Sequence, residues 1–157
     1  MWRKLRGSHI LSTNFMDIAL QEANAAAERG EVPVGAVLVC KGEILARDGN
    51  RTLELSDPTG HAEILVIRKA CEILQNQRLP ECDVYVTLEP CAMCAAAISF
   101  ARIRRLYFGA EDLKGGAVQN GTRFFEQPTC HHSPEWYSGI SERAAAQKLV
   151  EFFQSRR

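Results

Sequence analysis

The chain has 157 residues, of which 46% are hydrophobic and 24% charged, which is the composition of an ordinary globular domain. This excludes disordered, collagen-like and fibrous proteins. Lysine plus arginine number 19 and aspartate plus glutamate also 19, so the net charge of zero favours neither a nucleic-acid nor a membrane partner. We find no apolar run near the roughly 20 residues that span a bilayer and no secretion signal, so we expect a cytoplasmic protein without membrane contact.

The zero net charge conceals an uneven distribution along the chain. Residues 11–60 hold four basic and eight acidic residues, whereas residues 91–157 hold nine basic and six acidic ones. Positive charge therefore gathers in the C-terminal part, at Arg102, Arg104, Arg105, Lys114, Arg156 and Arg157. Such a cluster is usually a solvated face, but it is also what a local RNA contact requires.

The first half of the chain predicts a helix, a β-hairpin and a second helix. Alanine-rich sequence with apolar residues at helical spacing follows Asn14, which can cap a helix, and precedes Gly30, which can end it. Two short segments flank the Lys41-Gly42 turn, as in a hairpin. The expected elements are a helix over 15–28, strands over 34–40 and 43–47, and a helix over 61–75.

The second half predicts strands that alternate with helices. The expected elements are a strand over 84–88, a helix over 90–101, a strand over 105–108 and, after Ser141, a helix over 143–154. Between Gly109 and Ser141 the order of elements is not predicted. The alternation indicates an α/β fold in which helices cover both faces of a central sheet. We expect one domain over 14–157, preceded by an extension, 1–13, that is disordered or foreign to the native protein.

Two motifs at helix starts predict a zinc site. Cys91 and Cys94 are three residues apart, so their thiolates share one face of a helix, and the helix dipole favours their negative charge. His61 opens another helix, and side chains at a helix start lean beyond it into a shared pocket. We therefore expect one zinc ion per subunit, bound by His61, Cys91 and Cys94.

Three protein ligands leave the fourth tetrahedral position of zinc for water, as in catalytic sites. Zinc lowers the pKa of that water to about 7, and Glu63, held nearby without being a ligand, can accept and return its proton. The order His-x-Glu and Pro-Cys-x-x-Cys is the signature of zinc nucleobase deaminases. Hydrolytic deamination of a base that lies outside the stack is therefore the expected reaction.

A structural zinc site is the alternative interpretation, with a fourth ligand from Cys130, His131 or His132. Glu63 argues against it, because a structural site needs no carboxylate beside an open position. The spacing of the Cys130-His131-His132 run fits no known zinc pattern, which favours a loop that packs its histidines. The remaining cysteines are expected to be small buried hydrophobes: Cys40, Cys71 and Cys82.

Beyond the zinc motif, the span from Phe15 to Arg157 resembles the bacterial tRNA-specific adenosine deaminases, within the cytidine deaminase-like superfamily. The resemblance rests on 31–39, Asn50-Arg51, 57–63, 85–94, Arg102-Ile103, 108–110, Asp112, Lys114, Phe152-Phe153 and Arg156-Arg157. It implies a three-layer α/β/α sandwich with a mixed five-stranded sheet, and a homodimer. It also implies a hydrolase that acts on C–N bonds of cyclic amidines, converting the wobble adenosine of an arginine tRNA to inosine.

The resemblance also assigns roles to residues outside the zinc motif. Asn50 matches an asparagine that hydrogen-bonds the flipped nucleoside, the backbone at Ala62 would hold the base edge, and Asp112 matches an acidic residue that contacts the neighbouring sugar. The expected contacts of the terminal helix with the anticodon loop are Phe152, Phe153, Arg156 and Arg157. Asn50 could instead be an ordinary turn residue, and we expect at least one of the two phenylalanines to lie in the core.

One segment, 118–138, departs from the family pattern, so the surroundings of the target base are not implied by the resemblance. Two rival functions share the zinc motif or the zinc site. One is a deaminase of a free base or nucleotide, such as guanine or cytosine. The other is a zinc-stabilised RNA-binding module without turnover.

Overall fold

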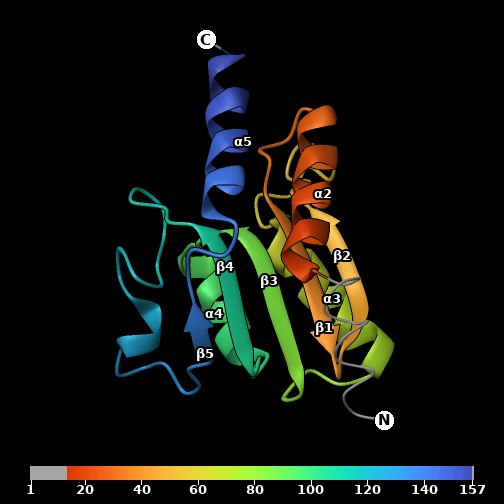
Figure 1. Ribbon diagram of the computed structural model, residues 1–157. Helices are drawn as coiled ribbons and strands as arrows, with labels where there is room; N and C mark the ends of the chain where they lie inside the picture. Colours follow the sequence, from red (N-terminus) through yellow and green to blue (C-terminus); the bar gives the residue numbers. More distant parts are fainter. Residues whose placement is uncertain (1–13, 157) are drawn as a thin grey trace, which may run out of the picture.

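A mixed five-stranded sheet with the order β2-β1-β3-β4-β5 forms the middle of the molecule (Figure 1). The computed structural model describes residues 14–156. The expected extension, 1–13, and the expected contact residue Arg157 lie outside the described residues. Strand β1 pairs antiparallel with β2 and β3, whereas β3, β4 and β5 run parallel. The strands are β1 (Gly35–Cys40), β2 (Glu43–Gly49), β3 (Cys82–Leu88), β4 (Arg105–Ala110) and β5 (Glu135–Tyr137).

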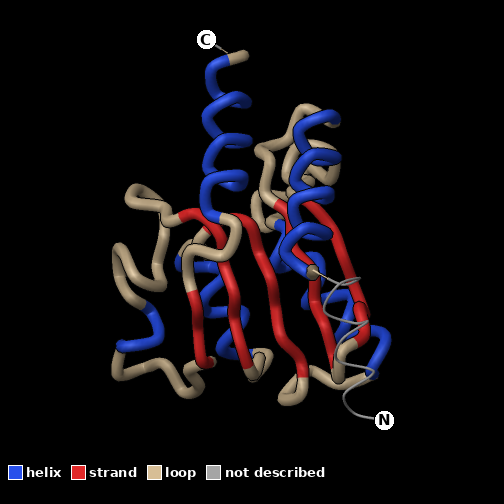
Figure 2. Tube along the Cα trace, in the orientation of Figure 1, coloured by secondary structure: helices blue, strands red, loops and turns tan. Residues whose placement is uncertain are grey.

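Helices cover the sheet from two sides, which confirms the predicted three-layer α/β/α sandwich. Figure 1 shows α2 (Phe15–Glu28) and α5 (Glu142–Gln154) in front of the sheet, and α3 (Ala62–Leu74) and α4 (Ala92–Phe100) behind it. The tube in Figure 2 shows that α5 extends well past the ends of the strands. No helix among residues 14–156 is long and apolar enough to cross a membrane.

The first helix lies where the sequence places it and packs closely on β1. The Asn14 side chain accepts hydrogen bonds from the backbone N–H groups of Met16 and Asp17, and Gly30 follows the helix with a φ of 87°. Gly35 faces the helix so closely that a Cβ there would lie 2.0 Å from the carbonyl oxygen of Ala19. Only glycine permits this approach, which brings the end of α2 to the site described below.

The main hydrophobic core lies between the sheet and the α3 and α4 layer. Its fully buried members include Leu38, Val84, Val86, Ile98 and Phe108. Because β1 runs antiparallel to β3, the start of β1, the end of β2 and the carboxyl ends of β3 and β4 meet at one edge of the sheet. Helices α3 and α4 begin at this edge, so the fold gathers both zinc motifs there.

The structure differs from the sequence prediction in the unassigned segment and at the bounds of several elements, since β2, β3 and β4 are each longer than predicted. Strand β5 and a short 3-10 helix (Phe124–Glu126) occupy part of the unassigned segment. All three residues of β5 are exposed, so the strand has no buried and exposed alternation that sequence could reveal. The helix expected over 90–101 spans Ala92–Phe100, so it begins two residues later and ends one residue earlier than predicted, because Cys91 is the extended N-cap residue and Ala101 the C-cap residue of α4.

Candidate active site

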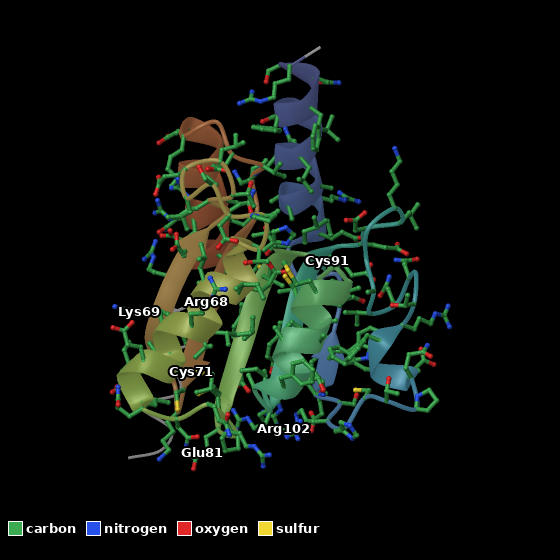
Figure 3. The ribbon with its side chains drawn as sticks, turned by 180° about the vertical axis from the view of Figure 1, so that it is seen from behind. Arg68, Lys69, Cys71, Glu81, Cys91 and Arg102 are labelled. Carbon is green, nitrogen blue, oxygen red and sulfur yellow. The ribbon has the colours of Figure 1, made fainter. Side chains whose placement is uncertain are left out.

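The starts of α3 and α4 bring the three expected zinc ligands together. His61 and Cys91 are both N-cap residues with extended backbones, and Cys94 lies in the first turn of α4. The Nδ1 atom of His61 lies 3.7 Å from Cys91 Sγ and 3.5 Å from Cys94 Sγ. Figure 3 shows Cys91 with its sulfur at the upper end of α4. Among the described residues, this is the group of three potential ligands that lie close enough to hold one ion.

The spacing of these donor atoms fits zinc. A tetrahedral zinc with Zn–S of about 2.3 Å and Zn–N of about 2.05 Å separates its nitrogen and sulfur ligands by about 3.6 Å. The two measured distances, 3.7 and 3.5 Å, are close to this value. One imidazole and two thiols also form a set that suits zinc better than hard cations such as magnesium or calcium.

The interactions among these three side chains favour negative charge on Cys91. The hydrogen bond from Cys94 is the largest of the effects that lower the pKa of the Cys91 thiol to about 4, and a contact with His61 adds to it. The pKa of Cys94 is raised, first by its hydrogen bond to Cys91 and then by burial. The interaction with Cys91 likewise raises the pKa of His61. A thiolate at neutral pH is therefore ready to bind a cation.

Glu63 lies in the first turn of α3 and is buried beside the ligand cluster. Burial raises the pKa of its carboxyl group to about 7. A carboxyl group with a pKa near neutrality can both accept and release a proton at physiological pH. The structure thus places Glu63 where a proton-transfer residue is expected.

A cavity of about 370 Å³ opens in front of these groups. Its lining residues are Val32, Val34, Asn50, Thr52, His61, Ala62, Glu63, Leu88, Glu89, Cys91, Asp112 and Gly115. Every residue expected to touch the base or its sugar, namely Asn50, Ala62 and Asp112, is therefore at the cavity. The volume lies within the range of small-molecule sites.

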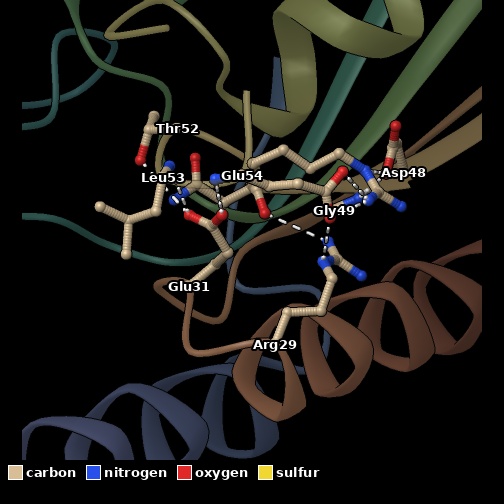
Figure 4. Close-up of polar contacts among 9 residues, drawn as sticks. Arg29, Glu31, Asp48, Gly49, Thr52, Leu53 and Glu54 are labelled. Carbon is tan, nitrogen blue, oxygen red and sulfur yellow. Dashed lines mark hydrogen bonds and ion pairs between the residues drawn. The ribbon is translucent and has the colours of Figure 1, made fainter. Parts of the chain in front are cut away.

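One wall of the cavity is held by the segment that follows β2. The backbone N–H of Asn50 donates to the carbonyl of Val34 at 3.0 Å, and the Asn50 carbonyl accepts from Arg29 Nη2 at 3.1 Å. The buried carboxylate of Glu31 accepts hydrogen bonds from the N–H groups of Leu53 and Glu54 (Figure 4). Asn50 thus lines the cavity from irregular backbone directly after β2, not from a turn, and both its backbone N–H and its carbonyl are hydrogen-bonded.

The opposite wall is held by Glu89, which the sequence prediction missed. Glu89 directly follows β3, is 2% exposed, and accepts backbone hydrogen bonds from Asp112, Val118, Gln119 and Asn120. Burial acts to raise the pKa of its carboxyl group, but the hydrogen bonds outweigh it and the net pKa is lowered. A charged residue at the end of an apolar strand, directly before Pro-Cys, was the available signal in the sequence.

The two phenylalanines of the terminal helix have different environments. Phe152 is 8% exposed, as expected for at least one of the pair, whereas Phe153 is 51% exposed. The Arg156 guanidinium lies 3.8 Å from the centre of the Phe152 ring. Phe153 and Arg156 line a second hollow of about 890 Å³ that also contains Lys114 and shares Asp112 with the first cavity. The exposed part of α5 is therefore continuous with the candidate active site.

The Cys130-His131-His132 run lies apart from the ligand cluster. His132 Nε2 donates to the carbonyl of Ile103 at 2.7 Å, and Cys130 Sγ donates to the carbonyl of His132 at 3.2 Å. Within residues 14–156, neither of these two residues belongs to a group that could hold a metal ion. These contacts support the interpretation that the loop packs its own polar side chains.

Comparison with known proteins gives the family. Residues 11–110 match the family described as the cytidine and deoxycytidylate deaminase zinc-binding region. A curated tRNA-specific adenosine deaminase from Agrobacterium fabrum is 65% identical over 145 residues, which cover 92% of this chain and 95% of the relative. The chain belongs to the bacterial tRNA-specific adenosine deaminase family.

Solved structures support the same grouping for this deaminase. A structure from a study of A-to-I editing by tRNA:A34 deaminases is 67% identical, with a TM-score of 0.85 over 86% of this chain and 98% of the other. A guanine deaminase from Bacillus subtilis is 31% identical, with a TM-score of 0.62 over 90% of this chain and 91% of the other. This deaminase therefore shares its cytidine deaminase-like fold with enzymes of different substrates. Zinc is its cofactor, since the family is zinc-binding and the ligand set fits that ion.

Proposed function

We propose that this protein hydrolytically deaminates adenosine to inosine at the wobble position of a tRNA anticodon. The observation that carries the proposal is the zinc-ligand cluster, with buried Glu63 beside it, at a cavity lined by Asn50 and Asp112. Two relatives of similar length, 65% and 45% identical to this chain, are tRNA-specific adenosine deaminases.

The chemistry divides between the metal and the protein. His61, Cys91 and Cys94 would hold zinc, which when bound supplies an activated water as the nucleophile. Glu63 accepts the proton of that water and passes it to the ring nitrogen next to the attacked carbon. Glu63 then takes the second proton, from the hydroxyl group now bonded to that carbon, and gives it to the leaving amine, so that ammonia departs and the carbonyl of inosine remains. Burial favours this shuttle because it brings the pKa of Glu63 to about 7, so that both protonation states are accessible.

The cavity walls would bind a base that has left the stack. The Asn50 side chain can donate to and accept from the base, the backbone at Ala62 can hold the base edge, and the Asp112 carboxylate can accept from a sugar hydroxyl. A base in a single-stranded loop costs less free energy to extrude than one in a duplex. This favours an anticodon loop as the substrate.

The surface beside the cavity suits a short stretch of RNA. Exposed Phe153 can stack on a base, and the cationic side chains of Arg156 and Lys114, in the same hollow, can contact phosphates. Arg157 is expected to add to this surface. The burial of Phe152 supports a packing role for that side chain. A footprint of few cations is compatible with the zero net charge of the chain, and it implies a modest salt dependence of binding.

We also propose that the substrate is an arginine tRNA, that the protein is a cytoplasmic homodimer, and that 14–157 form its single domain. The tRNA identity rests on the family resemblance. The dimer is supported by apolar surface on α4, where Ala92 and Phe100 are exposed and Phe100 is 67% exposed. An exposed apolar helix face of this kind is typical of an interface between subunits.

The test measures ammonia release from an anticodon stem-loop, free adenosine, guanine and cytosine in parallel, with zinc content determined on the same sample. The matched control is a stem-loop that already carries inosine at the wobble position. We expect release from the adenosine stem-loop alone. Release of ammonia from a free base would show that the protein is a base deaminase instead. If the zinc-loaded protein binds the stem-loop but releases no ammonia, it is a non-catalytic RNA-binding module.

A further inference from the structure

Glu89 lies between β3 and the zinc-ligand residue Cys91, and its buried side chain points to the loop that follows β4. We infer that Glu89 is a positioning residue, whose carboxylate fixes the loop 112–120 and thereby holds Asp112 at the rim of the cavity. This inference rests on the proposed function, because the role of Asp112 is contact with the RNA substrate. Neither the sequence motif nor the zinc chemistry requires this role of Glu89.

Both carboxylate oxygens of Glu89 are fully used by the loop. Oε1 accepts from the backbone N–H of Asp112 at 3.0 Å and from Asn120 Nδ2 at 2.7 Å. Oε2 accepts from the backbone N–H groups of Val118, Gln119 and Asn120 at 3.1, 3.0 and 3.0 Å. Three successive N–H groups that converge on one oxygen form a backbone cradle for an anion.

These hydrogen-bond donors stabilise the negative charge of Glu89. In the part of the chain that the structure describes, no lysine, arginine or histidine forms an ion pair with it. A buried carboxylate without a cation needs hydrogen bonds in its place, since desolvation is otherwise costly. The loop conformation and the buried charge therefore stabilise each other.

The parallel pairing of β3 with β4 explains why Glu89 can reach this loop. Leu88 pairs with Ala110, and the Glu89 N–H donates to the Ala110 carbonyl at 2.8 Å, so the two strand ends lie side by side. One step further, the Ala117 N–H donates to the carbonyl of Pro90 at 2.9 Å. The segment that leads to Cys91 is thus attached to the loop by backbone as well as by side chain.

The loop is shaped to receive the carboxylate. A Cβ at Gly116 would lie 2.4 Å from Glu89 Cδ and 2.5 Å from the Asp112 carbonyl oxygen, so a larger residue there would separate the carboxylate from the loop. Asp112 Oδ1 accepts from the N–H groups of Lys114 and Gly115 at 3.1 and 2.9 Å, which closes the turn next to the cavity. The Asp112 backbone is therefore fixed by Glu89, and its side chain by the turn.

Replacement by glutamine separates this role from simple space filling. Glu89→Gln keeps the shape of the side chain but turns one acceptor into an N–H₂ donor. In one orientation the new N–H₂ group faces the backbone N–H of Asp112 and the Nδ2 amide group of Asn120. In the other orientation it faces three backbone N–H groups. Either way donors oppose donors, and the loop must move.

The test compares Glu89→Gln with Glu31→Gln, a matched change of a buried glutamate that accepts backbone N–H groups at the opposite wall. For Glu89→Gln we expect a KM for the anticodon stem-loop raised about tenfold, kcat within about threefold of wild type and an unchanged zinc content. Combination with Asp112→Ala should add little, because both changes remove the same contact. Glu31→Gln and Asp112→Ala should instead be additive.

A second readout does not depend on turnover. Backbone amide exchange of Asp112, Val118, Gln119 and Asn120 should be faster in zinc-loaded Glu89→Gln than in wild type and unchanged in Glu31→Gln. Equal exchange of these amides in wild type and Glu89→Gln, or full additivity with Asp112→Ala, would overturn the inference. If wild type does not deaminate the stem-loop, the proposed function fails, and the exchange data still decide whether Glu89 fixes the loop.

Gly116→Ala is the alternative variant if Glu89→Gln does not fold. Its added methyl group would lie 2.4 Å from Glu89 Cδ and 2.5 Å from the Asp112 carbonyl oxygen, so it would separate the loop from the carboxylate while Glu89 itself remains. The same pattern of faster amide exchange at 118–120, with zinc retained, is expected. Unchanged exchange in Gly116→Ala would contradict the inference.

Discussion

The zinc-ligand cluster and the terminal helix α5 are positioned in opposite ways. His61 and Cys91 are the N-cap residues of two helices that start at the core, so backbone geometry fixes the directions of their side chains. In contrast, α5 extends beyond the ends of the strands (Figure 1), and next to the buried Phe152 its residue Phe153 is half exposed. The zinc-ligand cluster is thus fixed by the starts of two core helices, whereas the surface proposed for RNA lies on the exposed end of one helix.

The largest expected effect is the loss of turnover in Glu63→Ala. Without the buried carboxyl group, no protein group is placed to move the proton, and we expect activity to fall by about 10²- to 10⁴-fold. Zinc per subunit and stem-loop affinity should stay near wild type, because Glu63 is not among the three ligands. An active Glu63→Ala protein would exclude this residue from the mechanism, and single-turnover kinetics with metal analysis would detect it.

Zinc retention distinguishes the cysteines of the cluster from those of the loop. We expect Cys94→Ser to weaken zinc binding by more than about a hundredfold, since even changes to residues behind the ligands cost 10- to 100-fold. The matched control is Cys130→Ser, which removes a thiol that bonds only within its loop and to Ser99. Titration with a chelator measures both variants. Comparable zinc loss in Cys130→Ser would bring back the structural-site interpretation.

The adjacent phenylalanines of α5 test the comparison within one helix. Phe152→Ala should lower the free energy of unfolding by about 3 kcal/mol, because the ring is buried. Phe153→Ala should change it by less than about 0.5 kcal/mol but weaken stem-loop binding about tenfold, because the exposed ring is available for stacking. Urea unfolding and a binding titration separate the two effects. Weaker stem-loop binding in Phe152→Ala and lower stability in Phe153→Ala would contradict the proposed contact between Phe153 and the RNA.

A wall of the site, away from both regions compared above, is tested by Glu31→Gln, for which we expect a pH-dependent loss of stability. Burial acts to raise the pKa of Glu31, but hydrogen bonds from Glu54 and Leu53 outweigh it and the net pKa is lowered. A lowered pKa stabilises the folded state above the unfolded value, near 4.5, and this stability is lost as pH falls through the folded value. At pH 7 the variant should be about 1 to 3 kcal/mol less stable than wild type. Urea unfolding should show this difference narrowing below pH 4.5, and a constant difference would contradict the assignment.

Much of the fold and the chemical centre could be predicted from the sequence because both depend on local signals. The Asn14 cap and Gly30 mark the ends of α2, which the structure confirms residue for residue. The zinc ligands could be predicted because they belong to two short motifs, one at the start of each of two helices. The direction of a side chain at a helix start is determined by the helix itself. Cys91 was predicted to lie in the first turn of its helix, whereas it is the N-cap residue, just outside the helix.

The walls of the site could not be predicted in the same way. Glu31 and Glu89 act through backbone N–H groups of segments more than 20 residues away, and a backbone donor has no sequence signature. Strand β5 is three exposed residues that pair with β4 and place Trp136 against Phe108, so its presence depends on the rest of the sheet. These parts depend on tertiary contacts that only the folded chain shows.

The continuity of Glu89, Pro90 and Cys91 bears on how such an enzyme can be altered by evolution or design. Glu89 holds the loop 112–120 by its side chain, Pro90 contacts the same loop by its backbone carbonyl, and Cys91 is a zinc ligand. A substitution at Glu89 or Pro90 that moves the loop can therefore also displace Cys91 and weaken zinc binding. Variation of specificity is expected to be easier where side chains are exposed, as at Leu113 and Phe153. A library aimed at a new base or loop sequence should therefore randomise those outer positions and leave the 88–91 peptide intact.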